Sequence, residues 1–210
     1  MFTVAPSQIP LEHWKAGAVI SALLKHMGAY VVYVIPPLDA DPDTFDYEGY
    51  AGFFAVFEGS VDRWSVMTYD ANRGTGRPNA PFEWQAGIIT GLAQLTTNRK
   101  QLTRVRNKLL MGLPMYGWRS DGEAMTSGAL VDWLTGGGQG ASVRWDEDAK
   151  EHQFSVFTSG GGGQVGHTVT ASYPTMSFLC ARLRLAEEEG IAGVALWEIG
   201  QPLPSLMEAF

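Results

Sequence analysis

The sequence predicts an α/β fold in which four parallel strands alternate with helices and a small antiparallel subdomain interrupts the last repeat. Three observations lead to this prediction. Strand-like and helix-like segments alternate along the chain. The segment at 30–35 is a continuous run of β-branched and aromatic residues, typical of a parallel strand buried on both faces. Between residues 142 and 172, short strand-like segments are separated by turn residues, which is typical of antiparallel pairing.

The helices follow from the spacing of apolar residues and from glycine and proline signals. Leu11–Met27 has apolar residues at helical spacing and stops at Gly28. Pro81–Leu95 opens with a proline, which suits the first turn of a helix. The same reasoning gives helices around Tyr50–Phe57 and at Thr175–Glu189, and it allows short helices at Gly128–Leu134 and Pro202–Phe210.

The parallel strands are short and each is followed by turn residues. Tyr30–Ile35 ends at two prolines, and the other three predicted strands are Arg63–Tyr69, Lys108–Leu113 and Gly193–Trp197. The antiparallel strands are predicted at Ser142–Trp145, Gln153–Thr158 and His167–Ser172. We therefore divide the chain into one domain formed by residues 1–117 and 175–210 and an insertion subdomain at 118–174.

Composition excludes several classes of function. The chain has 210 residues, of which 45% are hydrophobic, and 15 basic against 22 acidic residues give a net charge of −7. Nucleic acids and anionic membranes attract basic surfaces, so we expect neither as the main partner. No apolar run approaches the roughly 20 residues that span a bilayer, so no membrane span is expected. Met1–Pro10 also lacks the basic start and apolar core of a signal peptide.

We expect neither a metal nor a cofactor. The single cysteine, Cys180, cannot form an internal disulfide, and the four histidines show no paired spacing typical of metal ligands. Residues 161–166 match the glycine pattern of dinucleotide sites. That pattern needs a helix directly after it, and here a predicted strand follows, so a hairpin tip is the better interpretation.

The ends of the predicted parallel strands carry the functional candidates. The second strand ends with Met67, Tyr69 and Asp70, the third leads to Tyr116, and the fourth ends with Trp197 and Glu198. Carboxyl ends of parallel strands meet at one edge of a sheet. Aromatic faces there can stack on sugar rings, and carboxylates can accept hydrogen bonds from sugar hydroxyl or amide groups. On spacing alone, a second interpretation remains open, in which Tyr69 and Trp197 fill the core and Asp70 caps a helix.

Four segments resemble glycoside hydrolase family 18, the chitinase family. Residues 67–70 resemble the M-x-Y-D segment of the sixth barrel strand, residues 109–117 the seventh strand, and residues 193–198 the eighth. Residues 143–175 are similar to the family's antiparallel insertion between its last two strands. The match covers roughly residues 10 to 210. Two further segments, at 78–81 and 197–201, are most similar to the chitinase domain-containing branch of the family.

The resemblance implies a (β/α)₈ barrel and a retaining hydrolysis in which the acetamido group of the substrate itself attacks, with a glutamic acid as proton donor. It implies that Tyr69 holds the acetamido oxygen, that Asp70 binds hydroxyl or amide hydrogens, and that Trp197 stacks under the sugar ring. The family takes its acid from a D-x-x-D-x-D-x-E motif. This sequence has no such motif; its nearest segment, at 43–48, lacks the third aspartate.

These implications define our expectations. A complete barrel needs roughly 250 residues, so we expect a partial (β/α)₈ TIM barrel of about four C-terminal βα units with an antiparallel α+β insertion. We expect a chitinase-like protein that binds N-acetylglucosamine oligosaccharides, is catalytically inactive as given and is secreted, lysosomal or endomembrane. Two alternatives remain: an active hydrolase of chitin or peptidoglycan whose acid lies in a missing N-terminal half, and a protein-interaction module.

Overall fold

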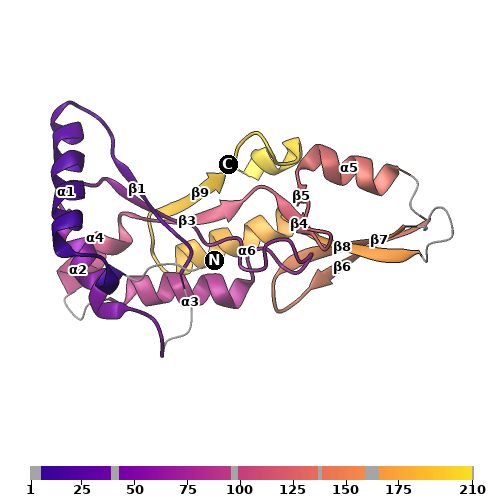
Figure 1. Ribbon diagram of the computed structural model, residues 1–210, viewed down its shortest axis with the longest axis horizontal. Helices are drawn as coiled ribbons and strands as arrows, with labels where there is room; N and C mark the ends of the chain where they lie inside the picture. Colours follow the sequence, from indigo (N-terminus) through magenta and orange to yellow (C-terminus); the bar gives the residue numbers. More distant parts are fainter. Residues whose placement is uncertain (1–5, 39–42, 96–98, 137–138, 159–165, 210) are drawn as a thin grey trace. The chain divides into compact units, whose positions relative to one another are not determined.

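The computed structural model describes residues 6–38, 43–95, 99–136, 139–158 and 166–209 (Figure 1). The chain forms two compact units. Unit 1 comprises Met1–Met67, Gln85–Gly112 and Leu185–Ala195, and unit 2 comprises Thr68–Trp84, Leu113–Arg184 and Leu196–Phe210. The boundaries predicted above, at 118 and 174, stay a prediction. The glycine-rich residues 161–165 lie outside the described part of the chain.

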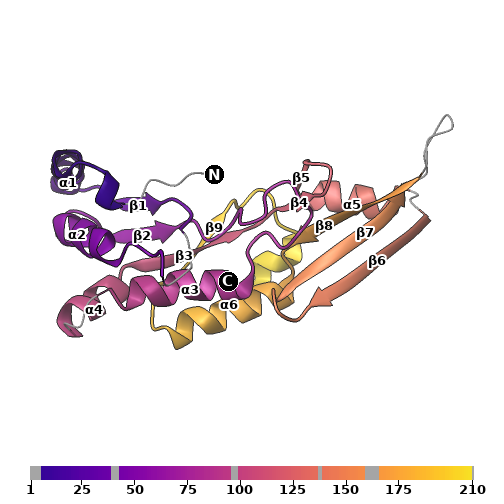
Figure 2. The ribbon, with the colours of Figure 1, turned by 60° about the horizontal axis from the view of Figure 1, so that its bottom comes forward.

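The parallel sheet gives unit 1 its framework. Its strands are β1 (Val32–Ile35), β2 (Arg63–Val66), β3 (Leu109–Pro114) and β9 (Gly193–Trp197), in the order β1-β2-β3-β9. Strand β1 runs parallel to β2, and β2 runs parallel to β3. Figure 2 shows β1, β2 and β3 side by side. The partial-barrel prediction is therefore confirmed in its parallel sheet and in the strands that form it.

Four helices of unit 1 precede or separate these strands: α1 (Leu11–His26), α2 (Tyr47–Phe57), most of α3 (Phe82–Ala93) and α4 (Arg99–Arg106). An aromatic cluster joins α2 to the sheet. Trp64 of β2 is 1% exposed, and the edge of its ring meets the ring of Phe54 at 4.6 Å between centroids. Helix α1 packs on α2 through Trp14 and Phe53, whose rings are 5.7 Å apart.

The prediction that the first strand is buried on both faces is wrong. Val32 and Val34 are 45% and 54% exposed, whereas Ile35 is 2% exposed. Strand β1 stands at the end of the sheet order, and its side chains alternate between a covered and an uncovered face. Helix α1 is similar, because Ile20 and Leu23 are each 59% exposed. Apolar periodicity shows which residues share a face, but it does not show whether a neighbour covers that face.

Unit 2 contains the antiparallel sheet that the sequence predicts. Its strands are β4 (Gly117–Arg119), β5 (Ala124–Met125), β6 (Gln139–Asp146), β7 (Glu151–Thr158) and β8 (His167–Tyr173), in the order β5-β4-β8-β7-β6. All four neighbouring pairs are antiparallel. Figures 1 and 2 show β6, β7 and β8 side by side. The predicted antiparallel insertion between the last two parallel strands is thus confirmed as a sheet, with β4 and β5 as strands that the sequence reasoning missed.

Helices α5 (Ser127–Thr135) and α6 (Met176–Glu188) complete the regular elements of this region, and α6 contributes residues to both units. The closing segment forms a 3-10 helix, η2 (Pro204–Ala209), instead of an α-helix. A further 3-10 turn, η1 (Pro6–Gln8), precedes α1. Across the described ranges, no helix combines the length and the apolar character needed to cross a membrane.

Candidate functional site

Unit 2 brings three of the six predicted site residues together, namely Tyr69, Asp70 and Tyr116, with the carboxylate of Asp70 at their centre. Its Oδ1 accepts a hydrogen bond of 2.5 Å from the hydroxyl of Tyr116 and one of 2.8 Å from Nε1 of Trp118. We call Tyr69, Asp70, Tyr116 and Trp118 the Asp70 cluster. Met67 ends the first segment of unit 1, where its N–H donates to the carbonyl of Ile35 at 2.9 Å.

The backbone at Asp70 has a left-handed conformation, with φ at 67°. Among residues with a side chain, aspartate and asparagine tolerate this region best. The residues that follow, 71–77, form turns, and α3 begins only at Phe82. The alternative that Asp70 caps a helix is therefore wrong. Its carboxylate instead accepts from two aromatic side chains, and it is only partly buried.

Three aromatic rings contact one another in sequence beside this carboxylate, and two of them donate to it. The rings of Tyr69 and Tyr116 meet edge to face with centroids 6.3 Å apart, and Tyr116 and Trp118 do the same at 5.8 Å. All three side chains are at most 8% exposed. The guanidinium of Arg73 lies over the Trp118 ring at 4.9 Å, which is within cation–π range. Contacts of this kind fix the ring positions before any ligand arrives.

Glycine at position 117 makes this spacing of Tyr116 and Trp118 achievable. A Cβ there would come within 1.7 Å of the carbonyl oxygen of Ser172. Strand β4 can therefore pair with β8 at this point only if residue 117 has no side chain. The close pairing places Trp118 opposite Ser172 and directs its indole N–H to Asp70.

The electrostatic environment favours the neutral form of both tyrosines. Burial, followed by the negative charge of Asp70, raises the pKa of Tyr69 to about 12. Burial also raises the pKa of Tyr116, with the hydrogen bond to Asp70 as the next cause. Both hydroxyl groups are neutral at physiological pH even with the ordinary tyrosine pKa, and the raised pKa values extend that neutral state further into alkaline solution. Tyr116 remains a hydrogen-bond donor, and the second oxygen of Asp70 remains an acceptor that a ligand could use.

A buried polar network lies behind Asp70. The Oδ1 of Asn79 accepts from the backbone N–H of Asp70 at 3.0 Å, and the carboxylate of Glu151 accepts from the N–H groups of Asn79 and Ala80 at 3.0 and 2.7 Å. Arg182 donates to the carbonyl of Ala80 at 2.7 Å. Burial raises the pKa of Glu151 to about 7, although Arg182 and the two backbone donors oppose the rise.

Trp197 and Glu198 occupy a more open place. Trp197 is 55% exposed, which excludes the alternative that it fills the core. Its carbonyl accepts from the N–H of Met115 at 2.7 Å, so its backbone lies beside the segment that leads into Tyr116. Glu198 is also exposed. Within the described residues, no ring contact links Trp197 to the Asp70 cluster, so the predicted role of both residues stays a prediction.

Sequence reasoning placed Trp118 at the end of the third strand without choosing it as a site residue, and it missed Asn79, Glu151 and Arg182. Trp118 follows Tyr116 by two residues on the same segment, so the alternation of an extended chain could have placed both rings on one face. Asn79 lies in the Pro78–Pro81 segment that had already been singled out. Glu151 and Arg182 carried no local signal, because the backbone groups of residues 79 and 80 that they bind are 71 to 102 residues away along the chain.

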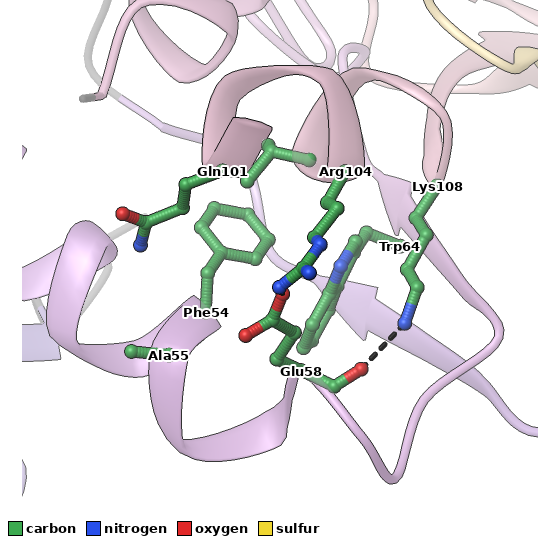
Figure 3. Close-up of a pocket in the computed structure, with 8 residues that line it drawn as sticks. Phe54, Ala55, Glu58, Trp64, Gln101, Arg104 and Lys108 are labelled. Atoms are coloured by element: carbon green, nitrogen blue, oxygen red, sulfur yellow. Dashed lines mark hydrogen bonds and ion pairs between the residues drawn. The ribbon is translucent and has the colours of Figure 1, made fainter. Parts of the chain in front are cut away.

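Unit 1 contains a small cavity between α2, β2 and α4. Figure 3 shows Phe54, Trp64, Arg104 and Lys108 around it, with the amino group of Lys108 donating to the carbonyl of Glu58 at 2.5 Å. Its volume is about 20 Å³, which is room for about one water molecule. We therefore exclude it as a site for an organic ligand.

Comparison with known proteins supports the fold. No protein-family model matches the chain, and no curated protein sequence matches it. Solved structures do match. A chitinase from Chromobacterium violaceum aligns with a TM-score of 0.70 and 17% identity, over 91% of this chain and 57% of that chain. A family GH18 chitinase from Cycas revoluta in complex with allosamidin aligns with a TM-score of 0.67 and 13% identity, over 96% and 64%.

A chitinase-like agglutinin from Robinia pseudoacacia aligns with a TM-score of 0.60 and 20% identity, over 97% of this chain and 60% of that chain. The chain therefore shares the fold of chitinases and chitinase-like proteins. It spans about half of the length of the solved chains that it matches. This coverage agrees with a partial (β/α)₈ barrel that carries an antiparallel insertion.

Proposed function

We propose that this chain is part of a family 18, chitinase-like protein that binds N-acetylglucosamine oligosaccharides at the Asp70 cluster. The observation that carries the proposal is the carboxylate of Asp70, which two aromatic side chains hold at 2.5 and 2.8 Å in a partly buried position. Such a carboxylate is oriented before the ligand binds, so binding a sugar hydroxyl or amide group loses little side-chain entropy. The buried rings of Tyr116 and Trp118 keep the carboxylate in this orientation.

We further propose that Trp197 and Glu198 form the exposed part of the same binding surface. Trp197 offers a half-exposed indole, which is the kind of side chain that stacks under a sugar ring. The acetamido oxygen of the sugar would accept from a tyrosine hydroxyl; Tyr69 is the position that the family resemblance implies. The agglutinin among the structural neighbours supports a binding role for this fold.

The chain as given is proposed to lack hydrolase activity. Its sequence has no D-x-x-D-x-D-x-E motif, and the Asp70 cluster contains a single carboxylate. We also propose that the chain corresponds to the C-terminal half of the barrel, in the chitinase domain-containing protein 1 branch. A secreted, lysosomal or endomembrane location is part of the same proposal.

Tryptophan fluorescence with an N-acetylglucosamine tetrasaccharide tests the binding role. We expect saturable changes in emission for the wild-type chain. Binding should weaken in Trp197→Ala and in Tyr69→Phe, which removes only the hydroxyl group. A glycosidase assay on the same tetrasaccharide should show no turnover. Emission that stays constant at millimolar sugar would contradict the binding proposal, and robust turnover would contradict the proposed inactivity.

One alternative has an observation in its favour. The chain spans 57% of a chitinase with the same fold, so a longer polypeptide could supply a catalytic acid to this site. Joining the chain to the preceding coding sequence and repeating the glycosidase assay on chitin and peptidoglycan fragments distinguishes the two. Turnover by the longer protein alone would favour the active hydrolase.

A further inference from the structure

The presence of a carboxyl group at the buried position of Glu151 is not explained by fold stability alone. Glu151 is 0% exposed and begins strand β7. Burying a carboxylate is unfavourable unless its oxygens are well satisfied, and an apolar side chain at such a position is often at least as stabilising. What Glu151 does with its two oxygens therefore indicates why this position holds a charge.

Both oxygens of Glu151 are committed to one short loop. Oε2 accepts from the N–H of Asn79 at 3.0 Å and Oε1 accepts from the N–H of Ala80 at 2.7 Å. Two adjacent N–H groups bound by one rigid carboxylate fix the orientation of the peptide units that join residues 78 to 80. The direction of the Asn79 side chain is fixed with them, and Asn79 is 1% exposed.

Asn79 links this fixed loop to Asp70 through hydrogen bonds. Its Oδ1 accepts from the N–H of Asp70 at 3.0 Å, and its Nδ2 donates to the carbonyl of Tyr116 at 3.2 Å. One side chain thus binds the backbone of both residues whose side chains meet in the Asp70 cluster. The left-handed backbone of Asp70, with φ at 67°, is held by this contact and by the N–H of Ala71, which donates to the carbonyl of Asn79 at 3.0 Å.

Arg182 completes the support from the opposite side. It is fully buried and donates to the carbonyls of Ala80, Ala149 and Lys150 at 2.7, 2.8 and 2.5 Å. Its guanidinium lies over the Phe178 ring at 3.9 Å and 3.9 Å from the nearer oxygen of Glu151. The arginine therefore ties the turn that leads into Glu151 to the loop that Glu151 binds.

We propose that Glu151 is a positioning residue for Asp70: through the backbone of residues 79 and 80 and the side chain of Asn79, it sets where the carboxylate of Asp70 meets Tyr116 and Trp118. The proposal rests on the sugar-binding function proposed above, which it deepens by adding an element of the antiparallel insertion to the binding site. Glu151 itself does not touch the sugar.

The test compares Glu151→Gln with a matched control. Glutamine keeps the shape but turns one hydrogen-bond acceptor into a donor that faces a backbone N–H group. Val169→Ala is the control, because Val169 is 3% exposed in β8 of the same unit and has no part in the network. We expect both variants to lower the melting temperature. Asn79→Ser, which withdraws the acceptor from the N–H of Asp70, is the second test variant should Glu151→Gln fail to fold.

Two readouts separate positioning from stability. The first is the Kd for the N-acetylglucosamine tetrasaccharide, measured well below the melting temperature. It should rise about tenfold in Glu151→Gln and Asn79→Ser and stay unchanged in Val169→Ala. The second is the nuclear magnetic resonance signal of the Trp118 indole proton, assigned with Trp118→Phe. It should move upfield only in the two test variants, because the bond to Asp70 weakens.

The outcomes are distinct. If Glu151→Gln and Asn79→Ser resemble Val169→Ala in both readouts, the positioning role is wrong. If the wild-type chain does not bind the tetrasaccharide, the proposed function is wrong. The indole signal then decides the positioning role by itself, since it needs no ligand.

Discussion

Replacing Asp70 separates the two demands that this position makes, namely a negative charge and a left-handed backbone. Asparagine keeps the backbone preference and the shape but removes the charge. Glycine keeps the backbone preference and removes the side chain. Alanine removes the side chain and also opposes the positive φ of 67°. The three variants therefore form a graded series.

The magnitudes follow from the two hydrogen bonds that Asp70 accepts. A bond to a charged acceptor contributes about 1 kcal/mol more than a neutral one, so Asp70→Asn should lower the free energy of unfolding by about 2 kcal/mol. Asp70→Gly leaves two buried donors without a partner and should lower it by about 4 kcal/mol. Asp70→Ala adds about 1 kcal/mol of backbone strain.

Thermal and urea unfolding measure this series. For a chain of this size, about 2 kcal/mol corresponds to roughly 4–8 °C in melting temperature. A spectroscopic titration adds an independent check, because Asp70 is one cause of the raised pKa of Tyr116. That pKa should fall in Asp70→Asn, although burial still holds it above its ordinary value. If Asp70→Ala is as stable as Asp70→Asn, the reasoning about both the backbone and the carboxylate is refuted.

Three further predictions concern other positions. Burial raises the pKa of Glu151 from 4.5 to about 7, so the folded chain binds this proton more tightly than the unfolded chain. The free energy of unfolding should therefore fall by up to ~3 kcal/mol as pH rises from 4.5 through 7. Urea unfolding at a series of pH values should show this fall in the wild-type chain and not in Glu151→Gln. Gly117→Ala should prevent folding, as circular dichroism would show, because its Cβ meets the Ser172 carbonyl, whereas Gly128→Ala has open space and should be tolerated. Trp197→Ala should change the melting temperature by less than about 2 °C, because the side chain is 55% exposed, while it weakens oligosaccharide binding in fluorescence titrations; equal binding would remove Trp197 from the site.

The sequence predicted the elements whose signals are local. The strands β3 and β9 and the helices α1 and α3 agree with their predicted positions to within a few residues, because apolar runs, prolines and glycines mark them. Helix α4 was missed, since its eight residues are mostly polar and Val105 is its buried apolar residue. Strand β5 was missed because two residues are too few to show the alternation of apolar and polar residues that indicates a strand.

The candidate site was predicted in part, because some of its residues also have a local signal in the sequence. Tyr69, Asp70 and Tyr116 follow strand ends, and the structure brings them together in unit 2. The polar network behind them could not be predicted. Glu151 and Arg182 form hydrogen bonds with backbone groups that come close to them only in the folded chain. A buried charge looks like any surface charge in a sequence until its partners are known.

The network around Glu151 has a consequence for the order of folding. The hairpin of β6 and β7 can form from neighbours in sequence, but Ala80 must meet Glu151 across 71 residues and Arg182 across 102. Closing such large loops is slow and brings no stabilisation until the contacts exist. The segment around residues 70–80 should therefore become ordered last, after α6 has docked. A ribosome would have to release residue 182 before Asp70 could reach its final geometry.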